Sequence, residues 1–162
     1  MPLDVIILGS GSATPTSQRY PTAQALKIDE CVFLIDCAEG TQMQLRRYKV
    51  KLQQIKAIFV SHLHGDHVFG LPGLFSSLSM LERTEPLDIF GPPYLEDWLT
   101  CQSKFFTSWG FPLHFRTLTA KEPEIIYGDK RITVSCFPLK HSISTYGYLF
   151  VENEKPLNIR RI

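Results

Sequence analysis

The chain has 162 residues, of which 44% are hydrophobic, and its 17 basic and 16 acidic residues give a net charge of +1. This length supports one domain with a hydrophobic core. The near-zero charge argues against attraction of the whole molecule to nucleic acid, although it is compatible with a local basic patch. Because the first residues lack a basic start and no apolar run could cross a bilayer, we expect neither a signal peptide nor membrane association.

The first apolar run, Leu3 to Leu8, is predicted to be a β-strand that ends at Gly9. A strand followed by a glycine-rich loop raises the possibility of dinucleotide binding. Thr14 replaces the third glycine of that motif, however, and no amphipathic helix follows. We therefore favour a tight turn that lets the loop 14–22 lie across a functional site.

A β-hairpin is predicted next, with strands at 25–28 and 31–35 and with Asp29 and Glu30 in the turn. A helix follows to about Tyr48, with Thr41 as a possible N-cap. Asp36 lies at the end of the second strand. We interpret it as a buried acceptor that holds backbone amides of a metal-binding loop, in preference to a metal ligand.

The most informative stretch is 56–73, where an apolar strand over 57–60 ends in the motif H-x-H-x-D-H. Its members are His62, His64, Asp66 and His67. Imidazole and carboxylate groups are ligands that zinc, manganese and iron accept. In a tight loop, the first two histidines can bind one ion while Asp66 and His67 bind a neighbouring ion, and two such ions can activate a bridging water. The alternative, a polar turn with histidines that bind no metal, does not account for three histidines within six residues.

The remaining elements form a second series of helices and strands. Helices are predicted over 69–81 and from Tyr94 to about Phe106, and strands over 87–90, 115–118, 125–127, 131–137 and 145–151, with a hairpin turn at Gly128 and Asp129. Four aromatic residues of the second helix fall near helical spacing: Tyr94, Trp98, Phe105 and Phe106. This spacing favours core packing over a base-stacking platform.

One further histidine has a predicted role. His141 follows a strand, and the pair His62 and His64 lacks a third partner, so we expect His141 to join them as a metal ligand. His114 has no such argument and is expected to be structural. The four cysteines, which form no C-x-x-C pair and lie in or beside stretches typical of core, predict a reduced, cytoplasmic protein with free thiols.

Four segments together carry a family resemblance: LGSGSATPTSQRY, FLIDCAEGTQMQL, VSHLHGDHVFGLPGL and PLKHSISTYGYLF. They resemble the metallo-β-lactamase superfamily and, within it, the ribonuclease Z family of transfer RNA 3′-processing endonucleases. The histidine motif alone indicates only the superfamily, whereas the PT-x-x-R loop and the D-C-x-E-G-T-Q segment point to the narrower family. The resemblance runs from about Leu3 to Leu157.

The resemblance implies an α+β fold, the αββα sandwich, with two zinc ions. One zinc would be held by His62, His64 and His141, and the other by Asp66 and His67. Asp66 would also be the general base for the attacking water. The metal-activated hydroxide would cleave precursor transfer RNA and leave a 3′-hydroxyl on the transfer RNA. Arg19 matches the family's loop motif and is expected to contact substrate.

The family's proteins are about twice as long, and their second half supplies further metal ligands and an arm that binds transfer RNA. Residues 1–162 are therefore expected to form a truncated metallo-β-lactamase-like domain, the N-terminal half, with at most one tightly bound zinc. The exposed apolar sheet face of such a half predicts association, as a homodimer or with another chain. Two alternatives stay open: another metallo-β-lactamase-type phosphodiesterase that acts on small substrates, or an inactive fragment that binds RNA or a partner.

Overall fold

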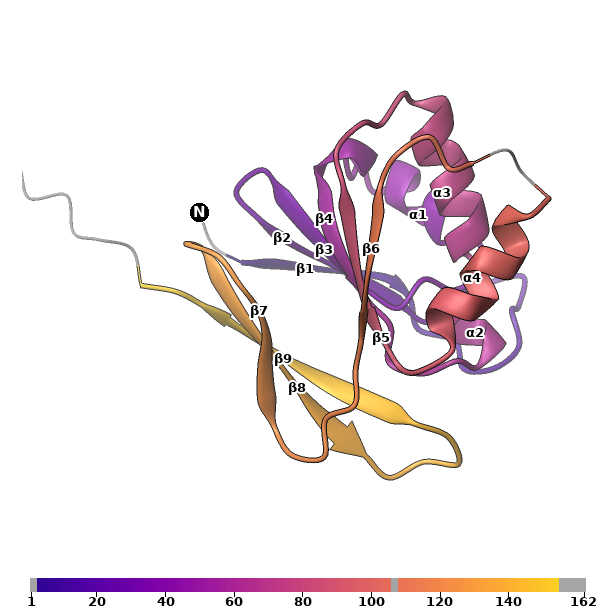
Figure 1. The fold of residues 1–162 in the computed structure, drawn as a ribbon. Helices are drawn as coiled ribbons and strands as arrows, with labels where there is room; N and C mark the ends of the chain where they lie inside the picture. Colours follow the sequence, from indigo (N-terminus) through magenta and orange to yellow (C-terminus); the bar gives the residue numbers. More distant parts are fainter. Residues whose placement is uncertain (1–2, 106–107, 155–162) are drawn as a thin grey trace, which may run out of the picture.

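A computed structural model describes residues 3–105 and 108–154, in which two β-sheets and one layer of helices are stacked (Figure 1). The first sheet has six strands in the order β1-β2-β3-β4-β5-β6. Their bounds are Asp4–Gly9, Ala23–Ile28, Cys31–Ile35, Ile55–Phe59, Leu87–Gly91 and Leu113–Thr117. The first two pairings are antiparallel and the last three are parallel, so β3, β4, β5 and β6 end at the same edge.

The second sheet has three antiparallel strands in the order β7-β8-β9. Their bounds are Glu124–Gly128, Ile132–Leu139 and Thr145–Glu152. Strand β8 shows the alternation of a strand with one covered face, because Ile132, Val134 and Cys136 are fully buried while the residues between them are not.

The helices all lie on one side of the first sheet, away from the second sheet (Figure 1). They are α1 (Thr41–Arg47), α2 (Gly65–Val68), α3 (Leu71–Met80) and α4 (Leu95–Ser103), with a short 3₁₀ turn at Leu52–Gln54. Among the described residues, no helix covers the outer face of β7-β8-β9. The three layers are thus consistent with an α/β/β part of the predicted sandwich.

Each interface between layers has its own hydrophobic core. Between the helices and the first sheet, the apolar side of α3, including Leu74, Phe75 and Leu78, packs against strand residues. Between the two sheets the core is aromatic. Phe59 stacks on Phe90 with ring centroids 4.9 Å apart, and rings from the second sheet meet Phe59 edge-on.

The predicted strands and the hairpin at Asp29 and Glu30 are confirmed, within a few residues at their ends. The expectation that no helix follows the glycine-rich loop is also met, because β1 leads through this loop to the antiparallel strand β2. A Cβ at Gly9 would lie 1.8 Å from the carbonyl oxygen of Pro21, so glycine permits the loop to cross back over the strand.

Three local predictions are wrong. Thr41 does not cap α1, because Gly40 takes the left-handed conformation (φ 79°) at the N-cap and Thr41 is already the first helical residue. The metal motif is not wholly a loop, since α2 starts at Gly65 and carries Asp66 and His67. The aromatic residues around α4 are not all core residues.

Two of those aromatics are exposed, with 76% of Tyr94 and 83% of Phe105 accessible to solvent. Trp98 is partly buried against the core between the helices and the first sheet. Phe106 lies outside the described residues. Helical spacing alone therefore did not identify which aromatics are covered.

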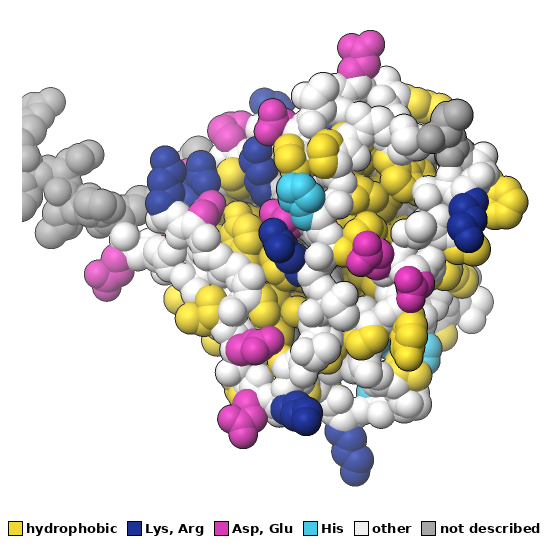
Figure 2. Space-filling model, in the orientation of Figure 1, with side chains coloured by type: hydrophobic (Ala, Val, Ile, Leu, Met, Phe, Trp, Pro, Cys, Tyr) yellow, Lys and Arg dark blue, Asp and Glu magenta, His cyan; other side chains and the backbone are white. Residues whose placement is uncertain are grey.

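The surface is chemically mixed. On the face seen in Figure 2, basic and acidic side chains are interspersed, and hydrophobic side chains are visible between them. This face shows no continuous basic patch on the described residues. Within the described residues, none of the helices is long and apolar enough to span a bilayer.

Candidate metal centre

The site forms where strands of both sheets end. Asp36 follows β3 and Ser61 lies just beyond the end of β4, and these two strands are parallel neighbours, so their carboxyl ends bring the two residues together. The backbone N–H of Asp36 donates to the carbonyl of Phe59 over 2.9 Å. From the second sheet, the hydroxyl of Tyr148 donates to the carbonyl of Val60 over 2.6 Å. The histidine loop is therefore attached to both sheets.

Three histidines converge here from two distant segments. His62 Nε2 lies 3.0 Å from His64 Nδ1, and His141 Nε2 lies 3.5 Å from the same nitrogen. The candidate ligand atoms of the three residues all lie within 4.8 Å of one another. Tetrahedral zinc with Zn–N bonds of about 2.0–2.1 Å requires nitrogens about 3.3 Å apart. The donor set and its spacing therefore fit a zinc-sized ion.

The pKa of His62 favours metal binding. Burial, together with the charges of His67 and His64, lowers the pKa of His62 from 6.5 to about 4. The imidazole is therefore neutral at physiological pH, which is the form that coordinates metals. The hydroxyl of Ser61 lies 3.0 Å from His62 Nδ1, on the side away from His64.

Asp36 holds the second part of the site. Its Oδ2 lies 2.7 Å from His67 Nδ1, and its two oxygens accept hydrogen bonds from the backbone N–H and the hydroxyl of Ser61 at 2.8 and 3.0 Å. With Nδ1 protonated and held by Asp36, Nε2 of His67 is left as the acceptor, and it faces Asp66 Oδ2 at 3.6 Å. Asp36 thus contacts Ser61, which precedes the histidine motif, and His67 within it, on the side of the His67 ring opposite Asp66.

The pKa of His67 reflects two opposing effects. Burial lowers it, but the hydrogen bond to Asp36 and the negative charges of Asp36 and Asp66 more than compensate, so the pKa lies above 6.5. Cys37, next in the chain to Asp36, behaves differently. Burial raises the pKa of its thiol to about 12, so it remains a neutral core group and not a thiolate ligand.

Asp66 is also tied to the glycine-rich loop. The backbone N–H of Ala13 donates to Asp66 Oδ2 over 2.7 Å, across 53 residues of sequence. Ala13 makes this contact with a φ of 58°, which alanine seldom adopts. The residue just before the predicted loop 14–22 thus reaches Asp66 through a backbone group, a contact that no side-chain pattern could have indicated.

The predicted site residues do not all meet. The group of three ligand atoms found among the described residues comprises the three histidines, with Asp66 and His67 beside it as a pair. Arg19 lies in the turn that Thr16 stabilises, and it lines a separate cavity of about 280 Å³ with Gln44 and Arg47. His114, exposed and 3.6 Å from Asp88, lies on β6. Ser61 and Ala13 were not predicted from the sequence.

The chain is similar to a family model, to curated relatives and to solved structures. The family model described as "Anti-Pycsar protein Apyc1" matches residues 3–153. A ribonuclease Z of Phocaeicola vulgatus is 47% identical over 159 residues, covering 98% of this chain and 52% of the relative. The chain spans about half the length of the curated relatives it matches.

Solved structures give the same answer for the architecture. The structure titled human tRNase Z, short form (ELAC1), is similar with a TM-score of 0.81 and 32% identity, over 91% of this chain and 64% of that one. The metallo-β-lactamase fold protein YhfI of Bacillus subtilis is similar with a TM-score of 0.73, over 93% and 58% of the two chains. At 16% identity the latter supports the fold alone. The predicted α+β metallo-β-lactamase fold is confirmed, and the histidine cluster is compatible with metal binding.

Proposed function

The chain belongs to the family described as Anti-Pycsar protein Apyc1, and we propose that it is the N-terminal half of a zinc-dependent endoribonuclease that removes the 3′ trailer of precursor transfer RNA. Residues 1–162 would then be a truncated metallo-β-lactamase-like domain. The main support for the proposal is the convergence of His62, His64 and His141. These residues could hold a metal ion, and the chain's relatives are ribonucleases Z.

The metal centre follows from the donor groups. His62, His64 and His141 would hold one zinc, and Asp66 with His67 would contribute to a second. A pair of ligands is a weak site by itself, so we expect at most one tightly bound zinc in this chain. Bound zinc supplies a Lewis acid for the phosphoryl oxygens and lowers the pKa of a coordinated water.

The chain's own residues orient the reaction. Asp66, positioned by the N–H of Ala13, would accept the proton of the attacking water. As the water oxygen bonds to phosphorus, the bond to the 3′-oxygen breaks, and that oxygen takes up a proton from solvent to give the 3′-hydroxyl of the transfer RNA. Asp36 keeps His67 in the tautomer that leaves Nε2 unprotonated. Arg19 is proposed to contact substrate at a distance from the histidines.

Association with a second copy is part of the proposal. On the outer face of β7-β8-β9, Ile125, Leu149 and Val151 are exposed by 71%, 55% and 48%. Ile125 and Leu149 both pair with Ser135, so they lie in one row on this face. Exposed apolar side chains gathered on one sheet face favour a homodimer through that face. Sedimentation velocity checks it: wild type should sediment as a dimer and Leu149→Asp as a monomer.

The cysteines bear on the proposed location. All four are unpaired, and Cys31, Cys37 and Cys136 are buried. Free thiols fit a reducing compartment, so we propose that the protein is cytoplasmic.

Two other functions are tested alongside. The family model carries a name other than ribonuclease Z, which keeps a metal-dependent phosphodiesterase for small substrates as the second candidate. An inactive fragment that binds RNA or a partner chain is the third.

The deciding experiment compares zinc-loaded and chelator-treated protein on labelled precursor transfer RNA and on bis(p-nitrophenyl) phosphate. The proposal expects zinc-dependent cleavage of the RNA with a 3′-hydroxyl on the transfer RNA and a 5′-phosphate on the trailer, at a reduced rate in this chain. His64→Ala should abolish it and His114→Ala should retain it. Hydrolysis of the small ester alone supports the second candidate, and RNA binding without cleavage supports the third.

A further inference from the structure

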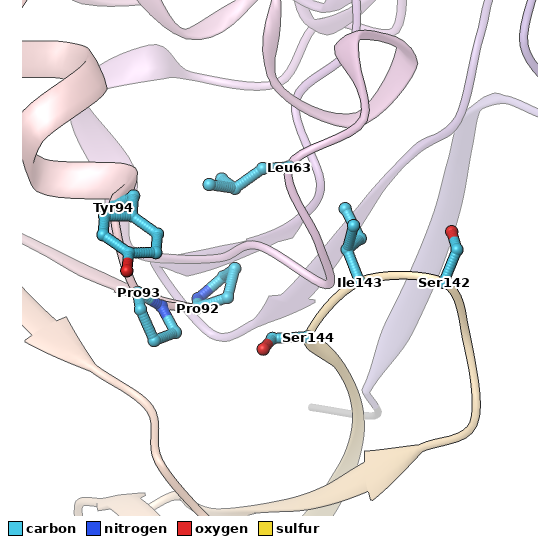
Figure 3. A pocket seen from close by; sticks show the side chains of 7 residues that line it. All are labelled: Leu63, Pro92, Pro93, Tyr94, Ser142, Ile143 and Ser144. Atoms are coloured by element: carbon cyan, nitrogen blue, oxygen red, sulfur yellow. The ribbon is translucent and has the colours of Figure 1, made fainter.

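A cavity of about 590 Å³ lies beside the histidine cluster, within the range of about 300–1,000 Å³ that ligand sites occupy. Leu63, which lies between two of the histidines in sequence, forms one wall. The loop that follows His141 forms another, and the turn before α4 forms the third (Figure 3). Its lining residues are Leu63, Pro92, Pro93, Tyr94, Ser142, Ile143 and Ser144. Two walls of the cavity therefore belong to the loops that carry the metal ligands.

An aromatic surface continues from this cavity. A second cavity of about 290 Å³ also includes Leu63 and Tyr94 in its lining, and Phe69 and Trp98 contribute to it. The rings of Phe69 and Trp98 lie 6.3 Å apart and are inclined by 32°. Phe69 is 63% exposed and Tyr94 is 76% exposed. We call Phe69, Tyr94 and Trp98 the aromatic shelf.

Tyr94 of the aromatic shelf has an unfavourable backbone conformation. Its φ is 73°, in the left-handed region, at the N-cap of α4. A bulky side chain is strained there, whereas glycine or asparagine would be accommodated without strain. Since most of the ring is exposed, core packing does not offset the cost. An unfavourable backbone that presents an exposed aromatic ring beside a candidate catalytic centre indicates a role in binding.

The lining chemistry limits what could bind. Neither cavity has a charged side chain among its lining residues, so a phosphate would find no counter-charge on them. Exposed aromatic planes instead favour a flat, uncharged ring system. Aromatic side chains stack on unpaired bases of single-stranded nucleic acid largely independently of sequence.

We propose that the aromatic shelf is a nucleobase-stacking subsite, at which Tyr94 holds an unpaired base of the RNA beside the phosphate to be cleaved. This inference rests on the proposed function, because it places a nucleotide next to the metal centre. In it, Tyr94 is a substrate-positioning residue and takes no part in proton transfer. The cavity then receives the sugar and base that neighbour the scissile bond.

The test measures binding of a fluorescent single-stranded RNA to the zinc-loaded chain by anisotropy, beside the same RNA with abasic sites around the expected cleavage position. Wild type should bind the intact RNA about tenfold more tightly than the abasic RNA, the size expected for one stacked base. Tyr94→Ala should lose this preference and Tyr94→Phe should keep it. Phe105→Ala, an exposed aromatic at the other end of α4, should behave as wild type.

Tyr94→Gly separates binding from folding, because it removes both the ring and the backbone strain. It should unfold at a temperature no lower than the other variants and still lack the preference for intact RNA. Equal preference in wild type and Tyr94→Ala, or equal affinity of wild type for both RNAs, would overturn the stacking subsite and leave the ribonuclease proposal intact. A wild-type protein that neither binds nor cleaves precursor transfer RNA would overturn both.

Discussion

Asp36 Oδ2 lies 2.7 Å from Nδ1 of His67, and this contact joins the end of β3 to the helical turn that carries the metal motif. The same carboxylate also accepts two hydrogen bonds from Ser61, the residue just before His62. One buried side chain therefore sets the position of both parts of the candidate metal centre.

Asp36→Asn is expected to weaken zinc binding by about 10–100-fold, the usual effect of losing a group that orients a metal-binding histidine. Asp36 acts on the three-histidine site through Ser61, whose hydroxyl lies 3.0 Å from Nδ1 of His62. It should also lower the free energy of unfolding by about 1–3 kcal/mol, because buried donors lose a charged acceptor. Competition titration with a zinc indicator and urea unfolding measure the two effects. Asp4→Asn, an exposed carboxylate on β1, is the matched control. Unchanged zinc affinity in Asp36→Asn would contradict the assignment.

The pH dependence of the metal-free protein should report the same contact. Because the folded pKa of His67 lies above 6.5, its pairing with Asp36 stabilises the fold fully below pH 6.5 and loses this effect as pH rises through the raised value. The lowered pKa of His62 acts in the opposite direction, and because the charge of Asp36 raises this pKa, Asp36→Asn should lower it further. The difference in unfolding free energy between wild type and Asp36→Asn should therefore be larger at pH 6 than at pH 8. Urea unfolding with chelator present measures this difference at each pH. The same difference at pH 6 and pH 8 would contradict the prediction.

His141→Ala should reduce the affinity for the tight zinc by on the order of 100-fold or more, because two imidazoles cannot form a tetrahedral site alone. Zinc should then no longer raise the melting temperature of the variant. The increase depends on the ratio of the free zinc concentration to the dissociation constant, and the variant's larger dissociation constant makes this ratio small. Differential scanning fluorimetry with and without zinc tests this. His114→Ala, at an exposed histidine on β6, should respond as wild type. Two tight zinc ions per wild-type chain would contradict the expected stoichiometry.

The contact between Ala13 and Asp66 is expected to hold the loop after β1 in place. Ala13→Pro removes the donating N–H and cannot adopt a φ of 58°, so the loop should detach. Trypsin should then cut after Arg19 several times faster than in wild type. Ala13→Gly keeps the N–H and accommodates the conformation, so its cleavage rate should match wild type. Equal rates in all three proteins would show that the contact does not restrain the loop.

Gly70 is expected to tolerate no side chain. A Cβ there would lie 2.0 Å from the backbone carbonyl oxygen of Ala38. The backbone is also held at this point, because the N–H of Gly70 donates a hydrogen bond to the carbonyl of Cys37. Gly70→Ala should lower the free energy of unfolding by about 1–3 kcal/mol or more. Gly128→Ala meets no atom within 4 Å and should change it by less than about 0.5 kcal/mol. Urea midpoints compare the two, and similar midpoints would refute the predicted clash.

The elements that could be predicted from the sequence are those with local causes. Strands β2 and β3 follow from two apolar runs separated by the turn residues Asp29 and Glu30. The N-cap of α1 was mispredicted because the left-handed conformation of Gly40 moved the start of the helix by one residue. The exposure of Tyr94 could not be predicted, because helical spacing does not reveal which side chains meet another element.

The sequence by itself determined the composition of the metal motif, since His62, His64, Asp66 and His67 lie within six residues and are held together by the chain. Only the tertiary structure decided that His141, 77 residues from His64, comes within 3.5 Å of it, and that the backbone of Ala13 reaches Asp66. The physical reason is that parallel strands end at one edge of the first sheet and the aromatic core brings the second sheet alongside. Packing between layers, which local sequence does not encode, thus brings together the distant parts of the site.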